Sequence, residues 1–131
     1  MKTTTKGFTV IELVFIIVIV ATASVIFFVQ KNTIEVAARD ETRKTAINAM
    51  YYGLEEVYYE ENKSYPRTID SKIIRSVDPE LFTDPFNVPI GDAESNYRYE
   101  ATNCTDDDCK SYTLRASLEN EDDYIKKNRT R

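Results

Sequence analysis

The sequence has no histidine and no tryptophan, and it contains two cysteines, three glycines and four prolines in 131 residues. Without histidine, the chain lacks both the usual general base of enzymes and the commonest neutral metal ligand. It also has no glycine-rich phosphate loop, no Gly-x-Ser-x-Gly motif and no Ser/His or Cys/His pair. We therefore expect no enzymatic activity, no cofactor and no metal site.

The first proline in the chain is Pro66, and between residues 8 and 62 the one glycine is Gly53. This scarcity of helix breakers predicts one long helix from residue 8 to about residue 62. At about 1.5 Å per residue such a helix is roughly 80 Å long, well beyond the thickness of a membrane. Pro66 disfavours the helical conformation at Tyr65, so we expect the helix to end just before it.

An apolar run extends over 22 residues, from Phe8 to Val29, and Glu12 is the one charged residue within it. That length matches the roughly 20 residues that a helix needs to cross a bilayer. An ionised carboxylate at the centre of such a segment costs on the order of 2.5–3.5 kcal/mol, so Glu12 is a candidate functional residue. Lys2 and Lys6 precede the run without any acid, which predicts a cytoplasmic N-terminus.

Residues 6–13 read Lys-Gly-Phe-Thr-Val-Ile-Glu-Leu. This segment resembles the class III signal of type IV pilins and of the pseudopilins of type II secretion. In that family a membrane peptidase cleaves after the glycine, here Gly7, and methylates the new N-terminal residue, here Phe8. The family's glutamate at the fifth mature position is Glu12 here. The resemblance implies a structural filament subunit, held in the cell membrane by one span before assembly and located in a cell-surface filament afterwards.

The resemblance also implies the partners: further copies of the chain in a helical homopolymer, other pilins, the prepilin peptidase, and an inner-membrane assembly platform with its motor. Within the filament, we expect Glu12 to be compensated by the Phe8 ammonium of a neighbouring subunit. The alternatives are a type II secretion pseudopilin, for which the segment Asp84–Pro89 is suggestive, and a single-pass anchor that displays a binding module. A plain signal anchor explains the span and its orientation but not Glu12. A cleaved secretory signal would have a shorter apolar core followed by a cleavage site of small residues, whereas here the small cluster at residues 21–24 is followed by more apolar residues.

The expected fold is α+β and pilin-like, with one long N-terminal helix packed on a small antiparallel β-sheet. We divide the chain into a leader (1–7), a transmembrane and assembly helix (8–29), the amphipathic half of the helix (30–64) and a small globular domain (65–131). An apolar stripe on the amphipathic half would cover the sheet; it consists of Ala46, Ile47, Met50, Leu54, Val57 and Tyr58. Ion pairs between residues four apart are expected on the wetter side: Glu35 with Arg39, and Asp40 with Lys44.

In the globular part, apolar spacing predicts a short helix at about 69–77. Alternation of period two predicts strands at 97–100 and 112–118, and a short edge strand can follow at 124–125. Cys104 and Cys109 lie between the two main strands. They should form a local disulfide if the domain is outside the cytoplasm; two unpaired thiols and a zinc site are the other possibilities.

Three acids, Asp106, Asp107 and Asp108, form the densest carboxylate cluster, which is either a solvated loop or a partial set of calcium ligands. The net charge is −5, and loss of the two leader lysines would make it −7. An acidic exterior gives no support to nucleic-acid binding. Three Asn-x-Ser/Thr tripeptides begin at Asn62, Asn103 and Asn128. Because chance matches to this pattern are frequent, the sequence by itself assigns no glycosylation.

Overall fold

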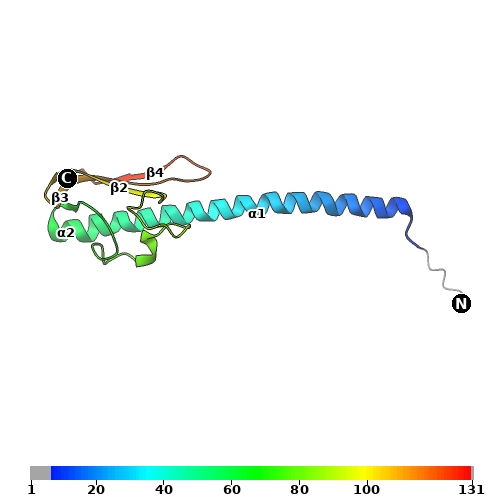
Figure 1. Ribbon diagram of the computed structural model, residues 1–131, viewed down its shortest axis with the longest axis horizontal. Coiled ribbons are helices and arrows are strands. Elements are labelled where there is room, and N and C mark those ends of the chain that lie inside the picture. Colours follow the sequence, from blue (N-terminus) through cyan, green and yellow to red (C-terminus); the bar gives the residue numbers. More distant parts are fainter. Residues whose placement is uncertain (1–6, 131) are drawn as a thin grey trace. The chain divides into compact units, whose positions relative to one another are not determined.

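The computed structural model describes residues 7–130, so Lys2 and Lys6 of the predicted leader lie outside the described residues. The chain has the predicted α+β architecture, in which a long N-terminal helix is packed against a small antiparallel sheet (Figure 1). It divides into two compact units, one ending at Glu35 and the other beginning at Val36. The first consists of the N-terminal part of the helix, and the second holds the rest of the helix and the whole sheet.

The long helix is α1, from Val10 to Tyr52, continued by a π-helical turn, η1 (Gly53–Tyr58), and by α2 (Tyr59–Asn62). Lys63 then adopts a left-handed conformation, with φ of 56°, and its backbone N–H donates to the carbonyl of Tyr59. This is a common way to end a helix, because it satisfies a carbonyl of the last turn. The predicted end of the helix just before Tyr65 is confirmed.

The sheet has four antiparallel strands, and β3 (Asp108–Ala116) lies at its centre. Along one side of β3 runs β2 (Tyr97–Thr105), in the register Tyr97 opposite Ala116 and Thr105 opposite Asp108. The other strands, β1 (Tyr65–Pro66) and β4 (Tyr124–Lys127), also pair with β3. A short 3₁₀ helix, η2 (Pro79–Phe82), lies in the connection between β1 and β2. Both predicted main strands and the edge strand are confirmed.

The core of the second unit lies between the helix and the sheet. Alternate residues of β3 point into it, as the period-two pattern predicted, and the helix contributes residues three or four apart. Buried apolar members include Ala46, Ile47, Met50 and Leu54 from the helix and Tyr97, Tyr112, Leu114 and Ala116 from the sheet. The predicted helix stripe is therefore confirmed up to Leu54.

Beyond Leu54 the prediction is wrong, because Val57 is exposed and Tyr58 is half-buried. The physical reason is the π-helical turn, in which hydrogen bonds connect residues five apart instead of four. That wider turn changes the phase of the residues that follow. In consequence Glu55, rather than Val57, is buried next to Leu54.

The predicted helix at 69–77 is also wrong, since this segment forms consecutive turns. The Asp70 carboxylate accepts hydrogen bonds from the backbone N–H groups of Lys72 and Ile73, both at 2.8 Å. This is the geometry of an N-cap, which starts a helical turn, but the next backbone hydrogen bond, from the Val77 N–H to the Ile74 carbonyl, spans three residues instead of four. A single helical turn remains, in which the Ile74 N–H donates to the Asp70 carbonyl. Ile69, Ile74 and Val77 still reach the core.

At Gly53 the turns over residues 74–77 pack directly against the helix. A Cβ atom at Gly53 would lie 2.6 Å from Cγ2 of Val77 and 2.8 Å from Cγ2 of Ile74. We expect Gly53→Ala to reduce the free energy of unfolding by about 1–3 kcal/mol, the usual cost of overpacking a core. Urea unfolding of the full chain in detergent measures this. Val77→Ala removes the methyl group that the new Cβ would meet first, so the Gly53→Ala, Val77→Ala double variant should lose less than the sum of the two single losses. Strict additivity of the two losses would show that packing at Gly53 is not the cause.

Candidate functional site

The first turn of α1 carries the predicted assembly residue Glu12. Gly7, Phe8 and Thr9 precede the helix, and Thr9 caps it: the Glu12 backbone N–H donates to Thr9 Oγ1 at 3.3 Å, and the Leu13 N–H donates to the Thr9 carbonyl at 3.1 Å. Thr followed three residues later by Glu is the capping-box pattern, and an acid in the first turn is favoured by the helix dipole. Local structure therefore fixes Glu12 at the start of the apolar helix.

Phe8 lies before the start of the helix, and Glu12 lies in its first turn. Phe8 is 78% exposed, and Glu12 is exposed as well. Within residues 7–130, no hydrogen bond or ion pair joins them. The structure thus places the two residues in the same exposed segment without bringing them together in one chain.

The apolar residues of the first unit are exposed along the entire segment. They carry large side chains with nothing packed over them, and they include Val10, Ile11, Leu13 to Val20, Val25 to Val29 and Ile34. The helix is long and apolar enough to cross a membrane. A continuous apolar surface of this length requires either lipid or other protein around it.

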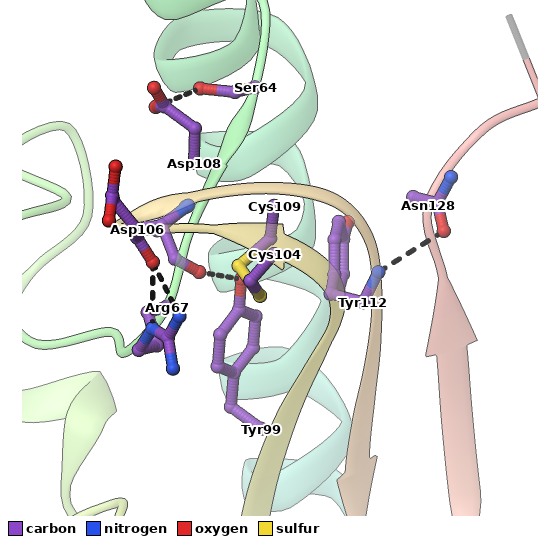
Figure 2. Close-up of a disulfide and its surroundings, with 10 residues drawn as sticks. Ser64, Arg67, Tyr99, Cys104, Asp106, Asp108, Cys109, Tyr112 and Asn128 are labelled. Atoms are coloured by element: carbon purple, nitrogen blue, oxygen red, sulfur yellow. Dashed lines mark hydrogen bonds between the residues drawn. A yellow bond between two sulfur atoms is a disulfide. The ribbon is translucent and has the colours of Figure 1, made fainter.

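The two cysteines are brought together, as predicted. Cys104 and Cys109 lie directly opposite each other in β2 and β3 and form a disulfide across the hairpin (Figure 2). Further contacts tie this hairpin to the segment that follows the helix: Arg67 donates to the Asp106 carbonyl from Nε at 2.9 Å and from Nη2 at 2.6 Å, and Ser64 Oγ donates to Asp108 Oδ1 at 2.7 Å. The disulfide therefore closes a hairpin that is also held by polar contacts.

The three acids of this hairpin do not converge. Asp106 is in a left-handed conformation at the turn, with φ of 55°, and the Asp108 carboxylate is engaged by Ser64. In the part of the chain between residues 7 and 130, no group of three or more His, Cys, Asp or Glu side chains is placed to hold a metal ion. In this geometry the acids form an exposed turn.

A second aspartate organises the connection before β2. The Asp84 side chain is buried, and its Oδ1 accepts from the backbone N–H groups of Phe86 and Val88, both at 2.9 Å. Oδ2 accepts from the backbone N–H and side-chain Nδ2 of Asn96, at 3.0 and 2.9 Å. Burial by itself would raise the pKa of Asp84, but these hydrogen bonds outweigh it and lower the pKa below its usual value. The carboxylate thereby fixes the segment Asp84–Pro89 as an ordered turn.

Glu55 is a buried residue that sequence reasoning missed. It has no exposed surface, and its Oε1 accepts from the hydroxyls of Tyr65 and Tyr112, both at 3.0 Å, and from the backbone N–H of Arg129 at 3.2 Å. Burial, and next the nearby Glu55 carboxylate, raise the pKa of Tyr112 above its usual range, so this tyrosine remains a donor at neutral pH. Glu55 thus joins the helix to β1, β3 and the C-terminal segment.

A buried ionic cluster at the other end of the domain was missed too. Arg43 is fully buried, and its Nη1 contacts Asp40 Oδ1 at 2.7 Å and Glu119 Oε1 at 2.9 Å. Arg39 pairs with the same Glu119, and Lys44 pairs with Glu121. The predicted pairs along the helix are therefore wrong, because Arg39 and Lys44 reach acids beyond β3 that lie some 80 positions later in the chain.

Asp40 is buried rather than placed on the wetter side of the helix. Its carboxylate accepts from the backbone N–H groups of Glu119 and Asn120, at 2.9 and 3.0 Å. Although burial raises the pKa of Asp40, these two hydrogen bonds and the Arg43 guanidinium lower it below its usual value. The Arg39 guanidinium, opposed by burial and supported by Arg43, lowers the pKa of Glu119 from 4.5 to about 2.

This cluster predicts loss of stability in acid. Since Glu119 has a lower pKa when folded, the unfolded chain takes up its proton first, and folding gains stability from the ionised carboxylate above about pH 4.5. That contribution should be lost as the pH falls from about 4.5 to about 2, and the low pKa of Asp40 acts in the same direction. The urea midpoint of the full chain in detergent, measured from pH 7 to pH 2, tests this. Glu119→Gln should decline less steeply, and a flat wild-type midpoint would contradict the linkage.

No protein-family model, curated protein or solved structure matches this chain. The features that bear on function are the segment with Gly7, Phe8 and Glu12 and the domain that follows it.

Proposed function

We propose that this chain is the structural subunit of a type IV pilus or a pilus-like filament. Cleavage after Gly7 and methylation of Phe8 would produce the mature subunit, which polymerises through its N-terminal helix. The observation that carries the proposal is the lone carboxylate of Glu12 in the first turn of a helix whose apolar surface is entirely uncovered between Val10 and Ile34. The basic leader and the glycine before Phe8 support it through their resemblance to the prepilin signal.

The mechanism follows from electrostatics at low dielectric. Cleavage would create an ammonium group on Phe8, four residues before Glu12. When helices pack side by side with an axial stagger, the ammonium of one subunit can lie beside the Glu12 carboxylate of the next. Their attraction is much stronger away from water, although desolvation offsets part of it. An apolar surface that first holds the subunit in lipid would then pack against neighbouring helices.

This proposal assigns a location and partners to each part of the chain. The N-terminus would face the cytoplasm while residues 8–29 span the membrane, and the domain would lie outside the cytoplasm. The Cys104–Cys109 disulfide is consistent with an oxidising compartment. The partners would be other copies of the chain and other pilins, the prepilin peptidase, and the inner-membrane assembly platform with its motor.

The mature N-terminus gives the most direct test of this proposal. Mass spectrometry of chain isolated from the cells that produce it should find a first residue corresponding to Phe8 and carrying one methyl group. A chain that keeps Lys2 and an unmodified Phe8 would have no ammonium to compensate Glu12, and this result would refute the assembly mechanism. Microscopy of filaments sheared from the same cells should find the processed chain in fibres.

A type II secretion pseudopilin is the second candidate. The segment Asp84–Pro89 resembles the Asp-Pro-aromatic-x-x-Pro segment of the major pseudopilins, and the four hydrogen bonds to Asp84 make it an ordered turn. Both candidates predict the same processing at Gly7 and Phe8. They differ in location: a pilin should be abundant in long extracellular fibres, whereas a pseudopilin should be processed but remain with the membrane.

A further inference from the structure

The three Asn-x-Ser/Thr tripeptides differ in the hydrogen bonds that their side chains make. This tripeptide is the acceptor pattern for N-linked glycans on surface segments of proteins outside the cytoplasm. A carboxamide or hydroxyl that is already engaged in the fold must break those contacts before it can react. Among the tripeptides at Asn62, Asn103 and Asn128, the best acceptor is therefore the one whose carboxamide and hydroxyl make no hydrogen bond within the fold.

Two of the three tripeptides are engaged in the fold. Asn62 Nδ2 donates to the Tyr58 carbonyl at 2.9 Å, and Ser64, two residues later, donates its hydroxyl to Asp108 at 2.7 Å. Asn128 is half-buried: its Oδ1 accepts from the Tyr112 backbone N–H at 3.2 Å (Figure 2), and its Nδ2 donates to the Arg129 carbonyl at 3.1 Å. Both carboxamides are therefore already engaged in hydrogen bonds within the fold.

Asn103 differs on each of these points. Asn103 and Thr105 are both exposed, and within residues 7–130 neither side chain makes a hydrogen bond. Asn103 is in a left-handed conformation, with φ of 55°, close to the exposed end of the hairpin. The disulfide of Cys104 holds the middle residue of the tripeptide against β3. Asparagine is favoured in left-handed conformations in any case, but that preference does not account for the free hydroxyl two residues later.

We propose that Asn103 is the acceptor of an N-linked glycan. This inference rests on the proposed function in one respect, because it requires the domain to lie outside the cytoplasm. The donor class is an oligosaccharide carried on a lipid diphosphate. The Asn103 carboxamide nitrogen forms a bond to the anomeric carbon of the sugar, the bond from that carbon to the diphosphate oxygen breaks, the carboxamide loses one proton, and the lipid diphosphate leaves.

Peptide mapping of the full chain from the cells that naturally produce it tests this proposal. The peptide that contains Asn103 should carry the added mass of an oligosaccharide, and the peptides of Asn62 and Asn128 should not. Asn103→Gln should abolish the added mass. Thr105→Ala should abolish it too although Asn103 is still present, whereas Thr105→Ser, which keeps a hydroxyl, should retain it. Asn62→Gln and Asn128→Gln should leave it unchanged.

The outcomes separate this inference from the proposed function. An unmodified Asn103 peptide in the wild-type chain overturns the inference, and the asparagine then serves only the backbone conformation. A modification that survives Thr105→Ala also overturns it, because the tripeptide is then not what is recognised. The N-terminal peptide of the same digest reports cleavage after Gly7 and methylation of Phe8, so the two proposals can fail independently.

Discussion

Replacing Glu12 with leucine is expected to abolish filaments while leaving the chain in the membrane. Leucine extends the apolar run and removes the carboxylate, so the Phe8 ammonium of a neighbouring subunit would be buried without a partner. Breaking one side of a buried ion pair typically costs about 3–5 kcal/mol. A loss of that size weakens each subunit contact by a factor of about 100 or more. Quantitative blotting of sheared filaments and of membranes measures the two pools.

A matched control for Glu12→Leu is available on the same helix. Glu35 is an exposed glutamate that pairs with Lys31 at 3.6 Å, and Glu35→Gln should change filament yield little. Glu12 has one competing role, which is recognition by the peptidase. If Glu12→Leu accumulates with its leader intact, the defect lies in processing rather than in assembly. Normal filament yield from a processed Glu12→Leu chain would contradict the electrostatic mechanism.

Replacing Glu55 with leucine is expected to cost about 3–5 kcal/mol of unfolding free energy. The change leaves the hydroxyls of Tyr65 and Tyr112 and the N–H of Arg129 without this acceptor. Each buried donor that loses its partner costs about 1–3 kcal/mol. For a small domain, whose total stability is typically about 5–15 kcal/mol, this is a large fraction. Urea unfolding of the full chain in detergent, followed by tyrosine fluorescence, gives the value.

Glu56 provides the control for Glu55, because it is the next residue in the same π-helical turn. Its side chain is 54% exposed and pairs with Arg129 at the surface. Glu56→Gln should therefore cost less than about 1 kcal/mol. Glu55→Gln keeps an acceptor oxygen and should fall between the two. Equal losses at Glu55 and Glu56 would show that the helical turn, and not the buried carboxylate, determines stability here.

Local signals in the sequence were sufficient for most of the fold. Pro66 determined where the helix had to end, and the alternation around Tyr97 and Tyr112 identified the strands that face the helix. The short separation of Cys104 and Cys109 was enough to predict a disulfide across a hairpin. Each of these features depends on residues close together in the chain, for which simple periodicity and turn rules hold.

The errors came from interactions that a local pattern does not contain. Arg39 and Lys44 found acids beyond β3 rather than on their own helix, because folding brings those acids to it. The π-helical turn altered the phase of the apolar stripe and buried Glu55, whose partners come from β1, β3 and the C-terminal segment. The expected helix at 69–77 has an N-cap at Asp70 but stops after one turn, and Ile69, Ile74 and Val77 of this segment instead pack into the core as part of irregular turns.

For the candidate site, the sequence identified Glu12 by contrast with its apolar neighbours, and the structure added the Thr9 cap that fixes it in the first turn. The proposed counter-ion belongs to another subunit. No pattern within one chain can therefore give the distance between the two charges, and that geometry has to come from a filament.

Asp40 and Glu55 together make the domain intolerant of changes in helix length. Asp40 is bonded to the segment after β3, and Glu55 is bonded to β1, β3 and Arg129, so the helix is attached at both positions. One inserted residue between them would rotate one attachment by about 100° relative to the other and shift it by about 1.5 Å. We therefore expect that no variant with an insertion or deletion between Asp40 and Glu55 keeps both attachments.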